Sequence, residues 1–349
     1  MLKHDMIIHR DESTYSAFPE VIRRRSGEIQ VRFGEIPLER LKGHRANWAH
    51  YGFGAEPRCL SSSDGGQTWL PGNGEGNDFA VFGAHITRLA SGDWLAAGFR
   101  YKLASSEREL GDCQPRRSLP GGLWAGNLGA YVIRSSDEGI TWGEPTWVRR
   151  GPVYPFGDLI ELPDGPLLMV AYGRPKEEPA DVSFMLKSED GGCNWEDFST
   201  IAADPAGKIH YQEPACIHLG QGKMLTMMRT GGAGGFLYQS TSADGGASWE
   251  APRDTGVWGH PAHLLRLKSG TLLCVYGYRQ EPFGIRACLS HDEGETWNLA
   301  NERVLRDDGG GWDLGYPRCV QLDDGSVLAV YYFNQGGDCR FIAATLFQE

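Results

Sequence analysis

The sequence predicts an all-β fold, a six-bladed β-propeller built from four-stranded antiparallel blades with Asp-box turns. Three observations support this prediction: an excess of glycine, a short turn motif that occurs five times, and six strand–turn–strand hairpins placed between the copies. The chain has 48 glycines in 349 residues, about twice average usage. It has no collagen-like period, so the glycines indicate many short strands joined by tight turns.

The repeated motif is Ser-x-Asp-x-Gly-x-(Thr/Ser/Asn)-Trp, which we call the Asp box. Its aspartates are Asp64, Asp137, Asp190, Asp244 and Asp292, separated by 73, 53, 54 and 48 residues. The carboxylate can accept hydrogen bonds from nearby backbone N–H groups, and the glycine can take the positive φ of the turn. The tryptophan is expected to pack between sheets. Five copies cannot share one active site, so these residues are structural.

The hairpins between the Asp boxes have turn glycines at Gly27, Gly92, Gly165, Gly222, Gly270 and Gly325. Each unit of about 50 residues then supplies four strands, which is one propeller blade. We expect a single domain, 1–349, with blades at roughly 10–75, 78–147, 152–200, 207–252, 257–302 and 312–349. The last blade lacks an Asp box. We expect it to close with a strand over 341–347 and an N-terminal strand near 6–9, which removes exposed sheet edges.

Charge and composition narrow the function classes. The net charge is -11 and no basic stripe is present, which argues against a nucleic-acid partner. No apolar run approaches the roughly 20 residues of a membrane span. None of the eight cysteines forms a C-x-x-C pair, so we expect no zinc site. We also expect no other metal and no cofactor, because none of the functions considered below needs one. The N-terminus has no signal-peptide core, so we expect a cytoplasmic protein, or a secreted or periplasmic one if a signal was removed. The oligomeric state stays open.

Polar residues recur where the first strand of each hairpin begins. Since the innermost strands of a propeller line its central channel, these side chains should converge at one mouth. They are His85, Asp158, Glu213, His260 and Tyr316.

Arginines recur where the second strands end. The positions seven to nine residues after the turn glycines are Glu35, Arg100, Arg174, Arg229, Arg279 and Asn334. Four arginines around the mouth would bind a substrate carboxylate through charge-assisted hydrogen bonds. The alternative is that each arginine caps its strand and pairs with a neighbouring carboxylate.

With its five Asp boxes, the chain resembles the sialidase (neuraminidase) superfamily over nearly its whole length. Gln212-Glu213-Pro214, Met228-Arg229-Thr230 and Gly315-Tyr316-Pro317 look like the segments that carry the family's Glu, one of its arginines and its nucleophilic Tyr. Arg279 or Arg286 could fill a further arginine position. The resemblance implies an exo-acting glycoside hydrolase for a terminal acidic sugar, in which Tyr316 attacks the anomeric carbon and Glu213 takes its proton.

The chain departs from the family pattern at two places. Ala17 stands where sialidases have the first Arg, and no Asp occurs between Phe33 and Arg58, where they have the acid/base Asp. That loop offers histidines instead, among them His44. Because histidine titrates near neutral pH, His44 and His260 are candidate acid/base residues. Each can also be a structural histidine.

Two other functions stay open. One is a hydrolase or lyase on the same propeller that cleaves a uronate-containing glycan, using His or Tyr acid/base chemistry and arginines that neutralise the uronate. The other is a non-catalytic propeller that binds sugar or protein.

Overall fold

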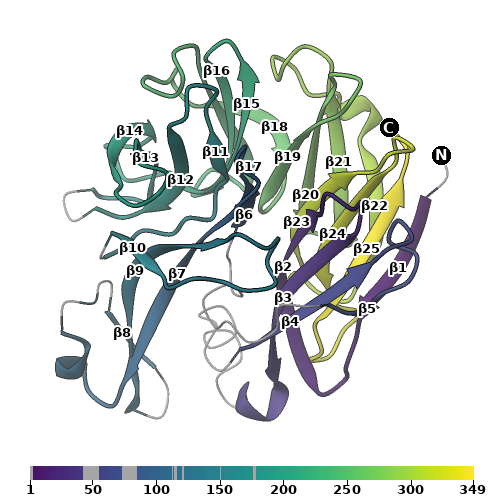
Figure 1. Cartoon of the computed structure of the whole chain (residues 1–349), viewed down its shortest axis with the longest axis horizontal. Helices are drawn as coiled ribbons and strands as arrows, with labels where there is room; N and C mark the ends of the chain where they lie inside the picture. The colour runs from purple at the N-terminus through teal and green to yellow at the C-terminus, as the bar shows by residue number, and fades with distance from the viewer. Residues whose placement is uncertain are drawn as a thin grey trace.

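The computed structural model describes residues 3–41, 55–72, 85–111, 113, 116–119, 122–149, 151–175 and 178–349. In this part of the chain, six antiparallel sheets are arranged around a common axis (Figure 1). Five sheets have four strands and one has five, so the predicted six-bladed propeller of four-stranded blades is confirmed, with one added strand. We number the blades 1 to 6 in the order of their innermost strands.

Blades 1 to 3 take up the first part of the chain. Blade 1 consists of β2 (Thr14–Arg23), β3 (Ile29–Pro37), β4 (Glu56–Ser62) and β5 (Leu70–Pro71). Blade 2 consists of β6 (His85–Arg88), β7 (Trp94–Ala104), β9 (Trp124–Ser135) and β10 (Thr146–Arg149), with β8 (Arg116–Ser118) paired to β9. Blade 3 consists of β11 (Leu159–Glu161), β12 (Leu167–Gly173), β13 (Val182–Ser188) and β14 (Glu196–Ala202).

Blades 4 to 6 complete the ring. Blade 4 consists of β15 (His210–Gly220), β16 (Lys223–Gly231), β17 (Phe236–Ser242) and β18 (Arg253–Trp258). Blade 5 consists of β19 (Ala262–Arg266), β20 (Leu272–Tyr278), β21 (Phe283–Ser290) and β22 (Arg303–Gly309). Blade 6 consists of β23 (Gly315–Gln321), β24 (Val327–Phe333), β25 (Phe341–Phe347) and β1 (Lys3–His9). Short 3₁₀ helices are η1 (Leu38–Leu41), η2 (Glu107–Leu110) and η4 (Leu299–Asn301). No helix in the described residues has the length and apolar character needed to span a membrane.

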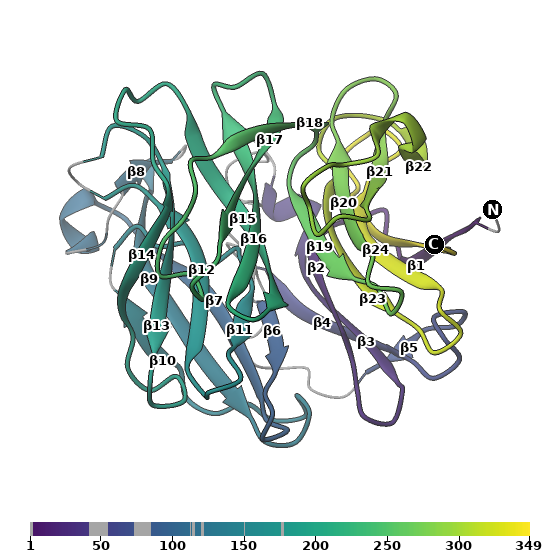
Figure 2. The same ribbon diagram turned by 90° about the horizontal axis from the view of Figure 1, so that it is seen from above.

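The ring closes through blade 6, as the sequence predicts. The N-terminal strand β1 runs antiparallel to β25, with Lys3 opposite Phe347 and Asp5 opposite Thr345. The Thr345 hydroxyl also donates a hydrogen bond to the Asp5 carboxylate at 2.7 Å. Figure 1 shows the two ends of the chain on the same side of the molecule with β1 beside β25, and Figure 2 shows the two ends close together from above.

The core is divided into layers, one between each pair of neighbouring blades. Strand β24 shows how this works, because it is buried along its whole length. Alternate side chains face opposite sides of a strand. Tyr331 and Phe333 therefore pack against blade 5, while Val330 and Tyr332 pack against blade 1. Covered on both faces, a middle strand has a continuous apolar sequence rather than an alternating one.

All five Asp boxes form the predicted turn. In blade 5, Asp292 Oδ1 accepts hydrogen bonds from the Ser290 hydroxyl at 2.7 Å and the Thr296 backbone N–H at 2.9 Å. Its second oxygen accepts the Thr296 hydroxyl at 2.6 Å. Each box tryptophan packs against the preceding blade, as Trp297 does against blade 4. The box thus links one blade to the next.

We expect the Asp boxes to make the fold sensitive to acid. The hydrogen bonds from Thr296 and Ser290 lower the pKa of Asp292 from 3.8 to about 2. A lowered carboxyl pKa contributes stability above pH 3.8, and this contribution is lost as pH falls toward 2. The unfolding temperature of Asp292→Asn should therefore lie below that of wild type at about pH 7, and the difference between the two temperatures should be smaller at about pH 2.5. The exposed turn variant Asp164→Asn is the control. An equal loss of stability at both pH values would show that the ionised Asp292 carboxylate is not its source.

Candidate active site

Three pocket side chains are presented by the same backbone feature. Phe18, Glu213 and Tyr316 each precede a proline, and each has a left-handed φ, of 56°, 46° and 49°. At all three positions the pairing of the first two strands of the blade shifts register. Such bulges redirect a side chain, and a left-handed non-glycine residue costs about 1–3 kcal/mol. The side chains of blades 1, 4 and 6 are thereby turned toward the channel mouth.

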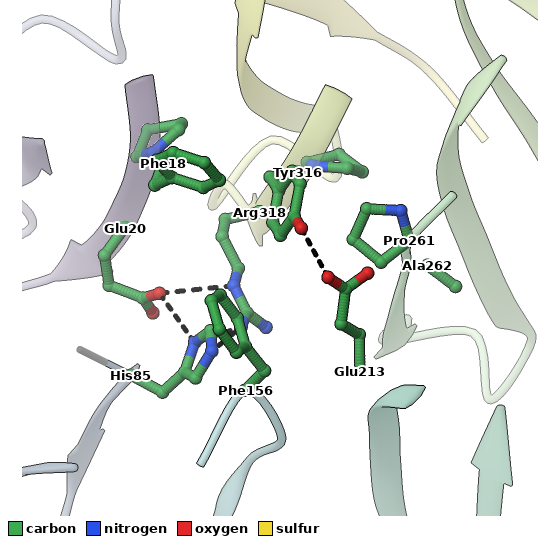
Figure 3. Close-up of a pocket in the computed structure, with 11 residues that line it drawn as sticks. Phe18, Glu20, His85, Phe156, Glu213, Pro261, Ala262, Tyr316 and Arg318 are labelled. Carbon is green, nitrogen blue, oxygen red and sulfur yellow. Dashed lines mark hydrogen bonds and ion pairs between the residues drawn. The ribbon is translucent and has the colours of Figure 1, made fainter. Parts of the chain in front are cut away.

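Tyr316 and Glu213 meet across the mouth. The Tyr316 hydroxyl donates a short hydrogen bond to Glu213 Oε1 (Figure 3). The other oxygen of Glu213 accepts a hydrogen bond from Arg229 Nη1 at 3.0 Å. Glu213 is only 6% exposed, so these contacts act in a region largely shielded from water. We call Tyr316 and Glu213 the reactive pair.

The protonation states of the reactive pair differ. Burial raises the pKa of Glu213, but Arg229 and the hydrogen bond from Tyr316 outweigh it, so the net pKa lies below the usual 4.5. Burial and the Glu213 charge raise the pKa of Tyr316. At neutral pH the pair is therefore a carboxylate that accepts a proton from a neutral phenol, which is the arrangement of a general base beside a nucleophile.

Arg279 lies beside the Tyr316 ring. Its guanidinium carbon is 5.7 Å from the ring centroid of Tyr316 and 5.7 Å from that of Trp312. Its Nε donates to the Leu314 carbonyl at 3.0 Å, and its Nη2 donates to the Tyr332 hydroxyl at 3.3 Å. Both acceptors are uncharged.

A second polar group lines the same pocket, and we call its members Glu20, His85 and Arg318 the Glu20 cluster. Glu20 Oε2 is 3.2 Å from Arg318 Nε and 3.2 Å from His85 Nδ1, and the Arg318 guanidinium also contacts the His85 ring. Asp158 contacts the cluster, 3.4 Å from Arg318 Nη1, and its other oxygen accepts a hydrogen bond from the Cys216 N–H. Burial raises the pKa of Glu20 to about 7 despite Arg318. Burial and Arg318 lower the pKa of His85.

The pocket is open to solvent and spans about 410 Å³, part of which is open solvent. Its polar lining is the reactive pair and the Glu20 cluster, and its apolar lining includes Phe18, Phe156 and three prolines. In Figure 3, the Glu20 cluster lies on one side and the reactive pair on the other. Among the described residues, no three His, Cys, Asp or Glu side chains are grouped as metal ligands would be.

The structure brings together some of the residues that the sequence singled out. Tyr316, Glu213 and His85 line the pocket, and Arg229 and Asp158 contact lining residues. His260 lies beside the pocket, with its ring stacked on Trp258 at 4.9 Å and Nε2 3.1 Å from the Gly235 carbonyl. Burial, Arg229 and Arg279 lower its pKa to about 4. His44 lies outside the described residues.

The four-arginine ring is only partly assembled. Arg229 and Arg279 both lie next to Tyr316 or its partner. Arg174 instead pairs with Asp181 at 3.2 Å, and its side chain is 49% exposed. Arg100 lies on β7 opposite Gly129 of β9, and neither Arg100 nor Arg174 lines the pocket. An arginine at the end of a second strand therefore does not necessarily belong to the pocket.

Sequence reasoning missed Glu20 and Arg318. Each lies two residues after a bulged residue, in Phe18-Pro19-Glu20 and Tyr316-Pro317-Arg318. The two-residue alternation of a regular strand is interrupted at these bulges, so the spacing alone could not place the two side chains in the pocket.

Comparisons with known proteins show the family and the fold. A family model described as a BNR repeat-like domain matches residues 118–329. A crystal structure of a Dyadobacter fermentans protein of unknown function is 32% identical, with a TM-score of 0.86 over 98% of this chain and 97% of that one. No curated protein sequence is significantly similar.

Two solved enzymes share the fold at lower identity. A Penicillium chrysogenum α-L-arabinanase complexed with arabinobiose is 14% identical, with a TM-score of 0.71 over 99% of this chain and 97% of that one. A Trypanosoma rangeli sialidase in complex with 2,3-difluorosialic acid, described as a covalent intermediate, is 13% identical, with a TM-score of 0.65. That likeness covers 98% of this chain and 59% of the sialidase. With the family model matching more than half of its length, this chain belongs to the BNR repeat-like domain family.

Proposed function

We propose that this protein is a retaining exo-glycoside hydrolase that removes a terminal acidic sugar, with Tyr316 as nucleophile and Glu213 as general base. The observation that carries the proposal is the hydrogen bond from the Tyr316 hydroxyl to a buried, ionised Glu213 that Arg229 holds in place. This pair lines the pocket at the channel mouth.

In the proposed first step, the Tyr316 oxygen attacks the anomeric carbon and the bond to the leaving group breaks. Glu213 takes the phenol proton during the attack, because the raised pKa of Tyr316 keeps the phenol protonated beforehand. Water then attacks the anomeric carbon and gives its proton to the group that protonated the leaving oxygen in the first step, while the bond to Tyr316 breaks and Glu213 returns its proton to the Tyr316 oxygen. His44 stays the candidate donor for the leaving oxygen. His260 is a weak candidate, since its pKa of about 4 leaves it neutral at pH 7.

A neutral nucleophile is suited to an acidic sugar. A carboxylate nucleophile would be repelled by a substrate carboxylate next to the anomeric carbon, whereas a phenol would not. Arg279 lies beside Tyr316 with uncharged acceptors, and Arg229 Nε is buried with no hydrogen-bond partner in the described part of the chain. These two guanidinium groups are the proposed anchors for the carboxylate.

A second candidate reaction is β-elimination on a uronate-containing glycan. The observation that favours it is His260, whose imidazole is neutral at pH 7 and lies under the influence of Arg229 and Arg279. A neutral histidine can take the proton next to a uronate carboxylate. Elimination would give an unsaturated, ultraviolet-absorbing product, which hydrolysis cannot give.

The first test is turnover of fluorogenic sialosides, uronides and arabinosides by wild type and Tyr316→Phe. The variant should lose at least about a thousandfold in kcat, because the nucleophile is gone. The loss of one hydrogen bond should lower the free energy of unfolding by about 0.5–1.5 kcal/mol only.

Tyr331→Phe is the matched control for this loss. Tyr331 is also a buried tyrosine of blade 6, hydrogen-bonded to Thr345 at 2.7 Å, and it should keep activity. Equal activity of both variants would rule out Tyr316 as nucleophile. Sugar binding without turnover by wild type would support a non-catalytic propeller.

The pH dependence tests the role of Glu213. The base must be ionised, so kcat/KM should fall as pH drops through the pKa of Glu213, which lies below 4.5. Arg229→Gln removes the cation that favours the ionised carboxylate, so the fall of kcat/KM at acidic pH should begin at higher pH in this variant. An unchanged pH profile would show that Glu213 is not the titrating base.

A further inference from the structure

The Glu20 cluster is a pre-formed polar surface in the pocket, built from three blades. Glu20 comes from β2, His85 from β6 and Arg318 from β23, and all three line the pocket. Their side chains are 14%, 9% and 10% exposed. Each holds the others through the contacts described above, so the cluster needs no rearrangement to meet a ligand.

The positive charge of Arg318 already has acidic partners within the protein. Arg318 lies 3.2 Å from the Glu20 carboxyl and 3.4 Å from the Asp158 carboxyl, so Asp158 pairs with the guanidinium even when Glu20, whose pKa burial raises to about 7, is protonated. His85 adds no positive charge, because burial and Arg318 lower its pKa. A substrate carboxylate placed here would meet Glu20 without an uncompensated cation.

Beside the reactive pair, positive charge is in excess. Arg229 forms an ion pair with Glu213, whereas Arg279 donates its hydrogen bonds to the uncharged Leu314 carbonyl and Tyr332 hydroxyl. Among the described residues, no carboxylate lies within ion-pair distance of Arg279. An incoming anion is therefore favoured on this side of the pocket.

We infer that Glu20, His85 and Arg318 form a subsite that binds uncharged hydroxyl groups of the terminal sugar, while the sugar's carboxylate lies on the Arg279 side. This inference rests on the proposed function. A carboxyl group accepts hydrogen bonds from hydroxyls, and a guanidinium donates to hydroxyl oxygens, so the cluster can bind adjacent hydroxyls of one ring. The substrate class is then a sugar with its only acidic group on one side of the ring and a hydroxyl pair on the other.

The walls between the two polar groups are apolar. Phe18 and Phe156 line the pocket together with Pro19, Pro261 and Pro317. Figure 3 shows Phe156 in front of Arg318, on the side of the Glu20 cluster. Such walls can contact the C–H faces of a sugar ring, while the polar groups bind its hydroxyls and its carboxylate.

The test measures binding of D-glucuronic acid, N-acetylneuraminic acid and D-glucose by calorimetry, with wild type, Glu20→Gln and Arg279→Gln. Glucuronic acid and glucose differ by one carboxylate, so they separate the two sides of the pocket. Glu20→Gln should weaken binding of the acid sugars and of glucose by similar factors, at least about tenfold. Arg279→Gln should weaken only the acid sugars.

Glu302→Gln is the matched control. Glu302 is a partly buried carboxylate paired with Arg286 in blade 5, at 2.5 Å, and its variant should keep wild-type affinities. Thermal unfolding of every variant identifies a loss of fold. Glu20→Ser, which removes the contacts without leaving an amide, should reproduce the effect of Glu20→Gln.

The outcomes separate the two proposals. Stronger binding of the acid sugars to Glu20→Gln would place the carboxylate at the Glu20 cluster and overturn the inference, and so would unchanged binding of all three sugars. Parallel weakening without turnover of any glycoside would keep the subsite and overturn the hydrolase. Failure of wild type to bind any of the sugars would overturn the inference, while turnover of another glycoside would still support the hydrolase.

Discussion

The antiparallel pairing of β1 with β25 holds the first and last strands of the chain in one sheet. Through it the innermost strands of all six blades face one axis. The pocket depends on this closure, because its polar residues come from blades 1, 2, 4 and 6 and are far apart in the sequence. Arg318 shows the consequence most clearly, since it is a blade 6 residue that contacts Glu20 of blade 1 and Asp158 of blade 3. Opening the ring would leave these buried charges without partners.

Ring closure brings the blades together, and strained backbone at three bulges turns side chains toward the pocket. The left-handed backbone at Phe18, Glu213 and Tyr316 is unfavourable for a non-glycine residue. It persists because the surrounding strands fix it and because two of the three residues hydrogen-bond each other across the axis. The same hydrogen bond, together with Arg229, keeps Glu213 ionised in a buried place. Fold and proposed chemistry thus share one set of contacts.

The sequence predicted the fold in detail because its signals are local. The Asp boxes and hairpin glycines each report a turn within a few residues, and their repetition gives the blade count. Glu213 and Tyr316 could be named because their segments resemble a known family. Partners across the axis could not be predicted in this way. These contacts depend on how loops and blades meet in space. Examples are the pairing of Arg174 with Asp181, the stacking of His260 on Trp258, and the ion pair of Arg318 with Glu20. The two-residue spacing from Phe18 to Glu20 and from Tyr316 to Arg318 was visible, but only the bulged backbone shows its meaning.

The central claim is that Tyr316 forms the covalent bond to the sugar. The most direct measurement is to incubate wild type with a fluorinated, slowly hydrolysed analogue of the glycoside it cleaves, and to map the modified peptide by mass spectrometry. We expect one sugar per chain, attached to Tyr316 and absent from Tyr316→Phe. Attachment to Glu213 or Glu20, or steady turnover of glycosides with no trapped sugar on the chain, would contradict the claim.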